Sequence, residues 1–131
     1  MVFLDQVCSH VESLLDRNDV GFCQNDLWYG NFLASKGVPF IDLEMARRGD
    51  IYFDLISFVH CHHLENEQTR IFLDAYAEVS GFYPSTNKVM RMRVGLHLHE
   101  GLLGFTKAHN GFSDPYHSDW GAQHLNALRE L

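Results

Sequence analysis

Three oxygen-bearing side chains between residues 26 and 42 have types and spacings that suit phosphoryl transfer. Asp26 and Asn31 lie five residues apart in a polar stretch, and Asp42 follows Asn31 by eleven residues. The transfer needs a carboxylate that orients the acceptor hydroxyl and takes its proton, and metal ions that neutralise the phosphate oxygens. Carboxylate and amide oxygens are hard ligands of the kind that Mg²⁺ prefers. Each residue taken alone is equally typical of an ordinary turn, so the hypothesis depends on the set.

Short apolar segments surround these residues and predict β-strands. The strands of a hairpin lie only about 5 Å apart, so a hairpin can bring Asn31 close to Asp42. A turn between the two is indicated by Ser35-Lys36-Gly37. The predicted strands cover residues 20–23, 31–33 and 38–41, with a loop over residues 24–30. Arg47 and Arg48 would either approach a phosphate or lie in a solvated turn.

The rest of the chain has the apolar periodicity of helices. Asp50 is a suitable N-cap, and Gly81 is a typical helix stop. The predicted helices cover residues 3–17, 50–62 and 66–80, followed by a helical period over 85–109 and a last helix that opens at Ser113 or Asp114. We therefore expect a predominantly helical α+β fold in which a small β-hairpin carries the site.

Three consecutive motifs resemble the aminoglycoside phosphotransferase and choline/ethanolamine kinase superfamily. Residues 22–33 (FCQNDLWYGNFL) resemble its catalytic loop, His-(Gly/Asn)-Asp-Leu-x-x-x-Asn followed by two apolar residues. Residues 40–44 (FIDLE) resemble its Ile-Asp-(Trp/Phe)-Glu segment, and residues 49–55 (GDIYFDL) resemble the Gly-Asp-x-x-x-Asp-Leu that follows. Three motifs in this order and spacing are specific, whereas any one of them alone would be weak.

The resemblance implies a role for each matching residue. Asp26 would be the catalytic base, and Asn31 and Asp42 would hold Mg²⁺ and thereby the phosphates of ATP. Glu44 would lie beside the metal or the acceptor, and Asp54 would accept hydrogen bonds from the catalytic-loop backbone. The implied activity is ATP- and magnesium-dependent phosphorylation of a hydroxyl on a small molecule, such as choline, ethanolamine or an aminoglycoside.

Two features depart from the family pattern. Gln24 stands where the family has a histidine that braces the loop, and its amide can still donate and accept hydrogen bonds. Only one predicted helix precedes Phe22, where the family has an ATP-binding lobe. We therefore expect residues 1–131 to form one domain, the C-terminal lobe of a protein-kinase-like fold. The alternative is a catalytically incomplete, non-enzymatic binding module, and the surface left by the missing lobe could drive self-association.

Aromatic side chains suggest how an acceptor would be held. Trp28 and Tyr29 would either line the acceptor site or cover the hairpin. Trp120 would suit a cationic acceptor through cation–π contact, although a packed Trp is the commoner arrangement. The His-Cys-His-His run at residues 60–63 contains zinc-ligand types, but a structural role is favoured because neighbouring residues on a helix point in different directions.

Composition narrows the class of partner and the compartment. The net charge of −7 disfavours a nucleic-acid partner, which would require a basic surface. No apolar run approaches the roughly 20 residues of a membrane span. The three cysteines form no paired spacing, so we expect reduced thiols in a cytoplasmic protein.

Overall fold

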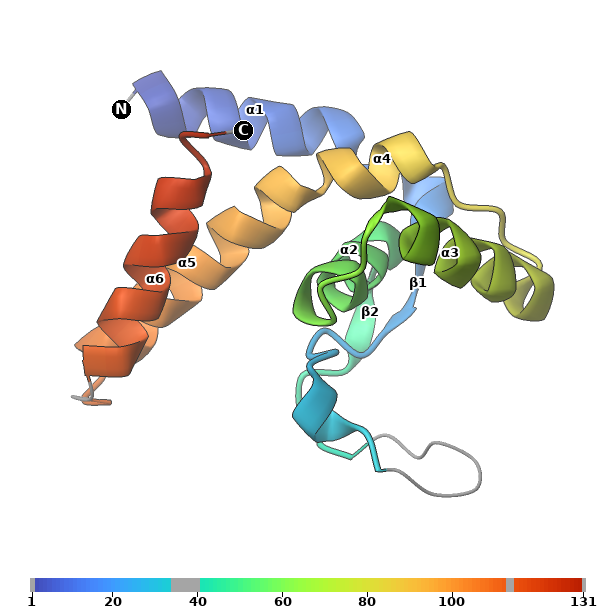
Figure 1. The fold of residues 1–131 in the computed structure, drawn as a ribbon. Coiled ribbons are helices and arrows are strands. Elements are labelled where there is room, and N and C mark those ends of the chain that lie inside the picture. Colours follow the sequence, from blue (N-terminus) through green and yellow to red (C-terminus); the bar gives the residue numbers. More distant parts are fainter. Residues whose placement is uncertain (1, 34–40, 113–114, 131) are drawn as a thin grey trace. The chain divides into compact units, whose positions relative to one another are not determined.

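The computed structural model describes residues 2–33, 41–112 and 115–130 (Figure 1). The chain divides into two compact units. Residues Leu14–Met92 form the first, here called the site unit. Met1–Ser13 and Arg93–Leu131 form the second, here called the terminal unit. The expectation of a single domain stays a prediction.

The site unit holds a two-stranded ribbon and three helices. Its strands are β1 (Val20–Cys23) and β2 (Arg47–Asp50), and its helices are α2 (Ile51–Cys61), α3 (Asn66–Ser80) and α4 (Thr86–Arg91). A short 3₁₀ helix, Arg17–Asp19, precedes β1. A second one, Tyr29–Asn31, lies in the loop that follows β1. The terminal unit holds α1 (Val2–Leu14), α5 (Arg93–His109) and α6 (Pro115–Ala127). The predominantly helical α+β class is therefore confirmed.

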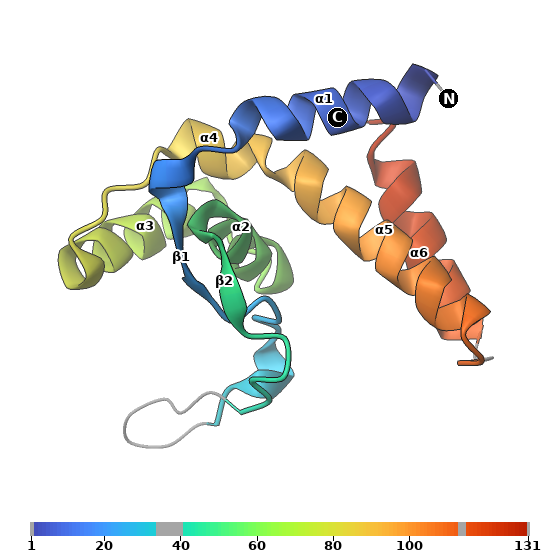
Figure 2. The ribbon, with the colours of Figure 1, turned by 180° about the vertical axis from the view of Figure 1, so that it is seen from behind.

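The β-ribbon differs from the predicted hairpin in its second strand. β1 forms as predicted, but it pairs antiparallel with β2, from Val20 opposite Asp50 to Cys23 opposite Arg47 (Figures 1 and 2). Of the two interpretations of Arg47 and Arg48, the solvated turn is therefore wrong, because pairing with β1 satisfies the extended backbone there, and an approach to phosphate stays a prediction. Gly49 lies against Cys23 in this pairing, where an added Cβ would lie 3.5 Å from the Cys23 sulfur.

The segment between β1 and β2 has little regular structure. The strand predicted at residues 31–33 is reduced to a single bridge at Phe32, and the preceding turn is a 3₁₀ helix. Of the strand predicted at 38–41, residues 38–40 lie outside the described residues and Ile41 is not in a strand. The candidate site therefore lies in an irregular loop whose two ends are joined by the pairing of β1 with β2.

Local signals set the helix boundaries in the site unit. Asp50 caps α2, since its carboxylate accepts the Tyr52 N–H at 2.8 Å, as predicted. Helix α3 has the predicted bounds, and Gly81 ends it in the left-handed conformation with φ 71°. The core of the unit is the face of α2 that carries Leu55, Ile56 and Val59, all buried.

The terminal unit is dominated by the close packing of α5 against α6. The helical period predicted over residues 85–109 forms two helices, since α4 ends with Met92 as its C-cap and α5 begins at Arg93. The predicted start of the last helix, at residues 113–114, lies outside the described residues. Across the described ranges, no helix is both long and apolar enough to cross a membrane.

Candidate active site

A carboxylate of α2 holds the loop that follows β1 by accepting hydrogen bonds from its backbone. Asp54, in the first turn of α2, accepts the backbone N–H of Gln24 at 2.7 Å and that of Asn25 at 2.9 Å. Burial raises the pKa of the Asp54 carboxyl, and these two hydrogen bonds oppose the rise. The two residues immediately before Asp26 are therefore fixed to a helix that lies thirty positions further along the chain.

Gln24 joins the Asp26 loop to the Asp42 segment through its side-chain amide. The amide oxygen accepts the Asp26 N–H at 2.5 Å, and the amide nitrogen donates to the Asp42 carbonyl at 3.0 Å. Gln24 is buried, so both bonds are shielded from water. The residue that replaces the family's histidine thus donates and accepts within the site.

Asn25 adopts a conformation that few residue types tolerate. Its φ is 62°, in the left-handed region that favours glycine and asparagine. Its side chain donates to the carbonyls of Cys23, at 3.2 Å, and Met45, at 3.0 Å. This geometry explains why Gly or Asn suits the position, and it adds a second link between the two loops.

Asp26 and Asn31 contact each other directly. The Asn31 side-chain nitrogen donates to the Asp26 carboxylate at 2.8 Å and to the Asp26 carbonyl at 2.9 Å. Asn31 is buried, whereas Asp26 is half-buried and retains access to solvent. Because the side-chain nitrogen of Asn31 donates to Asp26, the side-chain oxygen of Asn31 is the atom suited to ligate a cation.

Asp42 comes directly after Ile41, which is hydrogen-bonded to Asn31. The Ile41 N–H donates to the Asn31 carbonyl at 3.0 Å, which places the two loop segments side by side. Asp42 has a left-handed backbone with φ 60°, and its side chain is exposed. Glu44, two residues on, is exposed as well. The structure therefore brings Gln24, Asp26, Asn31 and the Asp42 backbone into one hydrogen-bonded assembly.

Residues 2–90 of the 131-residue chain match the model of the phosphotransferase enzyme family. The chain belongs to this family. The match spans every element of the assembly, from Gln24 to Asp54, and it confirms the resemblance that the three motifs indicated. This member of the family therefore places the family's sequence motifs on a ribbon, a loop and one helix.

Two curated relatives of this family member carry the same printed name, Protein LicA homolog. The protein of Metamycoplasma hominis is 40% identical over 55 residues, which cover 41% of this chain and 22% of that relative. The protein of Mycoplasma capricolum subsp. capricolum is 27% identical over 88 residues, which cover 66% of this chain and 37% of that relative. The matched part of the chain thus spans well under half the length of either relative.

The aromatic residues predicted for substrate binding lie in both units. Trp28 and Tyr29 are exposed in the loop, with their ring centroids 4.7 Å apart. The Trp28 ring lies over Gly30, where an added Cβ would come within 2.3 Å of it. Trp120 belongs to α6 of the terminal unit, where the Lys107 ammonium lies 6.0 Å from its ring centroid. A role for any of the three in binding an acceptor stays a prediction.

Sequence reasoning missed how much of the assembly depends on Asn25 and on β2. The signal for Asn25 was present, since Asn is one of the few residues that favour positive φ. No local signal marked β2, because its pairing with β1 joins residues 24 to 30 positions apart in the chain. Cys23, at the end of β1, is fully buried, and burial together with the Asp54 charge raises the pKa of its thiol to about 11. Cys23 is therefore a neutral packing residue.

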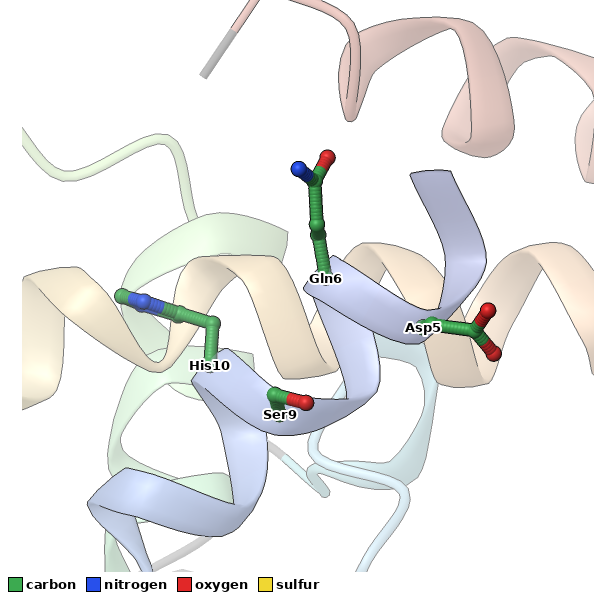
Figure 3. Close-up of a pocket in the computed structure, with 4 residues that line it drawn as sticks. All are labelled: Asp5, Gln6, Ser9 and His10. Carbon is green, nitrogen blue, oxygen red and sulfur yellow. The ribbon is translucent and has the colours of Figure 1, made fainter. Parts of the chain in front are cut away.

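Outside the site unit, the exposed face of α1 carries a shallow depression. Asp5, Gln6, Ser9 and His10 line it, and all four side chains project from the same helix (Figure 3). An opening lined by a single helix cannot enclose a substrate. We assign no part of the phosphotransferase chemistry to it.

Proposed function

We propose that this chain carries the catalytic base and the metal ligands of an ATP- and magnesium-dependent phosphotransferase that acts on a hydroxyl of a small molecule. The observation that carries the proposal is the hydrogen bond from Asn31 to the Asp26 carboxylate, together with the Gln24 amide that joins Asp26 to Asp42. Family membership supports phosphotransferase chemistry. The assignment of the individual roles rests on the three matched motifs.

In the proposed reaction, Asp26 accepts the proton of the acceptor hydroxyl as the hydroxyl oxygen bonds to the γ-phosphorus of ATP. The bond from that phosphorus to the β–γ bridging oxygen breaks, and ADP leaves. The Asn31 amide donates to the Asp26 carboxylate, so it holds one carboxylate oxygen and leaves the other available to the hydroxyl. Gln24 and Asp54 fix the backbone around Asp26 and thereby orient the base. These contacts supply positioning, which accounts for much of the catalysis in phosphoryl transfer.

The donor set fits magnesium. Asn31 offers an amide oxygen and Asp42 a carboxylate, both hard ligands, and the remaining positions would be filled by water and phosphate oxygens. Asp42 is exposed, so its carboxylate is accessible to a nucleotide. When bound, magnesium would neutralise charge on the phosphate oxygens. Glu44 lies two residues after Asp42 in the chain, and we propose that it assists as an outer ligand of the metal.

For the acceptor, we propose a choline-, ethanolamine- or aminoglycoside-like alcohol. All of these carry a cationic nitrogen together with a hydroxyl. The exposed rings of Trp28 and Tyr29 lie two and three residues after Asp26, where cation–π contact with such a nitrogen would hold its hydroxyl near the base. The acidic net charge of −7 favours the approach of a cation.

Calorimetry with ATP, in the presence and absence of magnesium, tests the metal site of the full chain. We expect binding that requires magnesium and that Asp42→Asn weakens. Absence of magnesium-dependent binding would contradict the proposal and favour the non-enzymatic binding module instead.

Turnover of the three acceptor types, followed by transfer of labelled phosphate from ATP, tests the base. Asp26→Asn should lower kcat by at least about 10²-fold, in line with general-base catalysis, while magnesium–ATP binding persists. Asp74→Asn is the matched control, because Asp74 lies exposed on α3 and should leave turnover unchanged. Undiminished turnover in Asp26→Asn would overturn the assignment of Asp26.

A further inference from the structure

A cavity of about 300 Å³ lies in the site unit between the catalytic loop and helices α2 and α3. Its volume is at the lower end of the range for small-molecule pockets, about 300–1,000 Å³. The described residues that line it do not include Asp26, Asn31 or Asp42. The cavity is therefore separate from the base and the metal ligands proposed above.

Aromatic rings form much of the cavity wall. Phe58 of α2 and Phe72 of α3 stack with their ring centroids 4.4 Å apart. Tyr76 lies one turn beyond Phe72 on the same face of α3, and Phe22 contributes a ring that is 76% exposed. A ligand with an apolar body would remove this apolar surface from water, which favours binding through the hydrophobic effect.

Gln24 and Asp54 supply an amide and a carboxylate to the cavity lining, and Tyr76 adds a hydroxyl. Among the described lining residues, none is basic. An anionic ligand would face the Asp54 carboxylate without a compensating cation, which is unfavourable in a partly buried site. A hydrogen-bond donor on the ligand, by contrast, could use the carboxylate lone pairs that the two backbone N–H groups leave available.

Gln24 and Asp54 are also the residues that hold the catalytic loop. Asp54 accepts the N–H groups of Gln24 and Asn25, and Gln24 accepts the N–H of Asp26. A ligand that contacts either side chain therefore acts on the backbone next to the base. The cavity and the proposed active site share these two residues as a common wall.

We propose that this cavity is an effector site for a small molecule with an aromatic or branched apolar body and one hydrogen-bond-donating head, an ammonium or a hydroxyl. Its occupation changes the position of Asp26 through Asp54 and Gln24. This effector is distinct from the acceptor, because the described lining of the cavity includes none of Asp26, Asn31 and Asp42.

Benzylamine, benzyl alcohol and benzoate test the proposal when titrated into the ¹⁵N-labelled full chain. These probes share one ring and differ in the head group. We expect saturable amide shifts at Gln24, Asn25 and Asp26 with at least one of the two donor probes, which also identifies the preferred head, and much weaker shifts with benzoate. No saturable shift with either donor probe, or equal binding of benzoate, would overturn the proposal.

Substitutions in α3 locate the binding site. Phe72→Ala removes part of the aromatic wall and should weaken probe binding about tenfold, and Phe72→Leu, which keeps apolar bulk and guards against loss of the fold, should weaken it less. Ile71→Ala is the matched control, because Ile71 is the neighbouring exposed residue and is not among the described lining residues. Unchanged affinity in both Phe72 variants would overturn the site. These measurements need neither ATP nor turnover, so their failure is distinguishable from failure of the proposed phosphotransferase function.

Discussion

The Asp54 carboxylate accepts the backbone N–H of Gln24 at 2.7 Å, although thirty residues separate the two in the chain. The second oxygen of the same carboxylate accepts the N–H of Asn25 at 2.9 Å. One side chain in the first turn of α2 therefore holds both residues that lead into Asp26. The geometry of the catalytic loop depends on the formation of this helix, so folding and the site are coupled.

Replacing Asp54 tests this coupling. Asp54→Asn presents an amide NH₂ to one of two backbone N–H groups and leaves that donor unsatisfied. We expect a loss of about 1–3 kcal/mol in the free energy of unfolding, measured by urea denaturation. Asp74→Asn is the control, since Asp74 pairs with Arg70 on an exposed face of α3 and such solvent-exposed pairs contribute little to stability. Equal losses in the two variants would contradict the role of Asp54.

The Gln24 bridge predicts a local effect on the Asp26 backbone. Gln24→Met keeps the shape of the side chain but removes both amide hydrogen bonds, so hydrogen exchange at the Asp26 N–H should accelerate about tenfold. Gln24→His can retain a ring nitrogen acceptor and should preserve more of the protection. Gln123→Met, on the exposed side of α6, should leave exchange at Asp26 unchanged. Unaltered exchange in Gln24→Met would contradict the bridge.

Close contact between α5 and α6 predicts that glycine is required at Gly104. An added Cβ there would lie 2.7 Å from the His117 carbonyl oxygen and 2.8 Å from the backbone of Gly121. Gly104→Ala should therefore lower the free energy of unfolding by about 1–3 kcal/mol, seen as a lower Tm in circular dichroism.

Gly95→Ala is the matched control in the same helix. An added Cβ at Gly95 would meet the Val11 methyl groups at 3.6 Å, which is ordinary contact. Alanine also favours a helix over glycine by up to about 1 kcal/mol, so Tm should stay constant or rise. A larger loss of stability in Gly95→Ala than in Gly104→Ala would contradict the close approach of α6 to Gly104.

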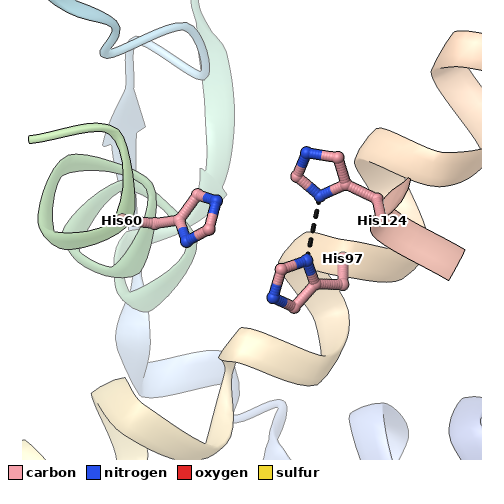
Figure 4. Close-up of side chains that lie close together, drawn as sticks. All are labelled: His60, His97 and His124. Atoms are coloured by element: carbon pink, nitrogen blue, oxygen red, sulfur yellow. Dashed lines mark hydrogen bonds between the residues drawn. The ribbon is translucent and has the colours of Figure 1, made fainter. Parts of the chain in front are cut away.

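A histidine pair predicts that the terminal unit loses stability in acid. The Nδ1 atoms of His97 and His124 lie 2.9 Å apart and share a hydrogen bond, so one ring must present an unprotonated nitrogen (Figure 4). Burial lowers the pKa of His124 below its ordinary 6.5, and the charge of Glu100 opposes this. Because the unfolded chain binds the proton more readily, stability is retained above pH 6.5 and is lost as pH falls from there through the lowered pKa.

Thermal unfolding followed between about pH 5 and 8 measures this effect. His124→Gln removes the titrating ring and should flatten the dependence of Tm on pH. His109→Gln, at the exposed end of α5, is the control that should preserve it. A Tm that rises on acidification of the unaltered chain would contradict the prediction.

Much of the fold was predictable where the signals are local. Asp50 as a cap and Gly81 as a stop placed α2 and α3, because capping depends on a few neighbouring backbone groups. Arg47–Gly49 looked like a turn because its polar residues and glycine are typical of one, yet it forms β2. Strand pairing is non-local, and the partner that decided it lies in β1.

The candidate site divides in the same way. The types and order of Asp26, Asn31 and Asp42 were predictable, since phosphoryl transfer needs a carboxylate and hard oxygen ligands at separated positions. The contacts that position these three residues were less predictable. Gln24 was expected to support the loop, but its link from Asp26 to the Asp42 carbonyl depends on how two loops approach each other in space.

The sequence by itself determined the family and the helical class, and it supplied the residues to which we assign the chemistry, because these depend on residue type and short-range spacing. The tertiary structure alone decided which strand pairs with β1, that α2 supplies the carboxylate beneath the loop, and that Asn25 and Gln24 connect the two loops. Those relationships arise from hydrogen bonds between residues some twenty to thirty positions apart, whose partners no local pattern specifies.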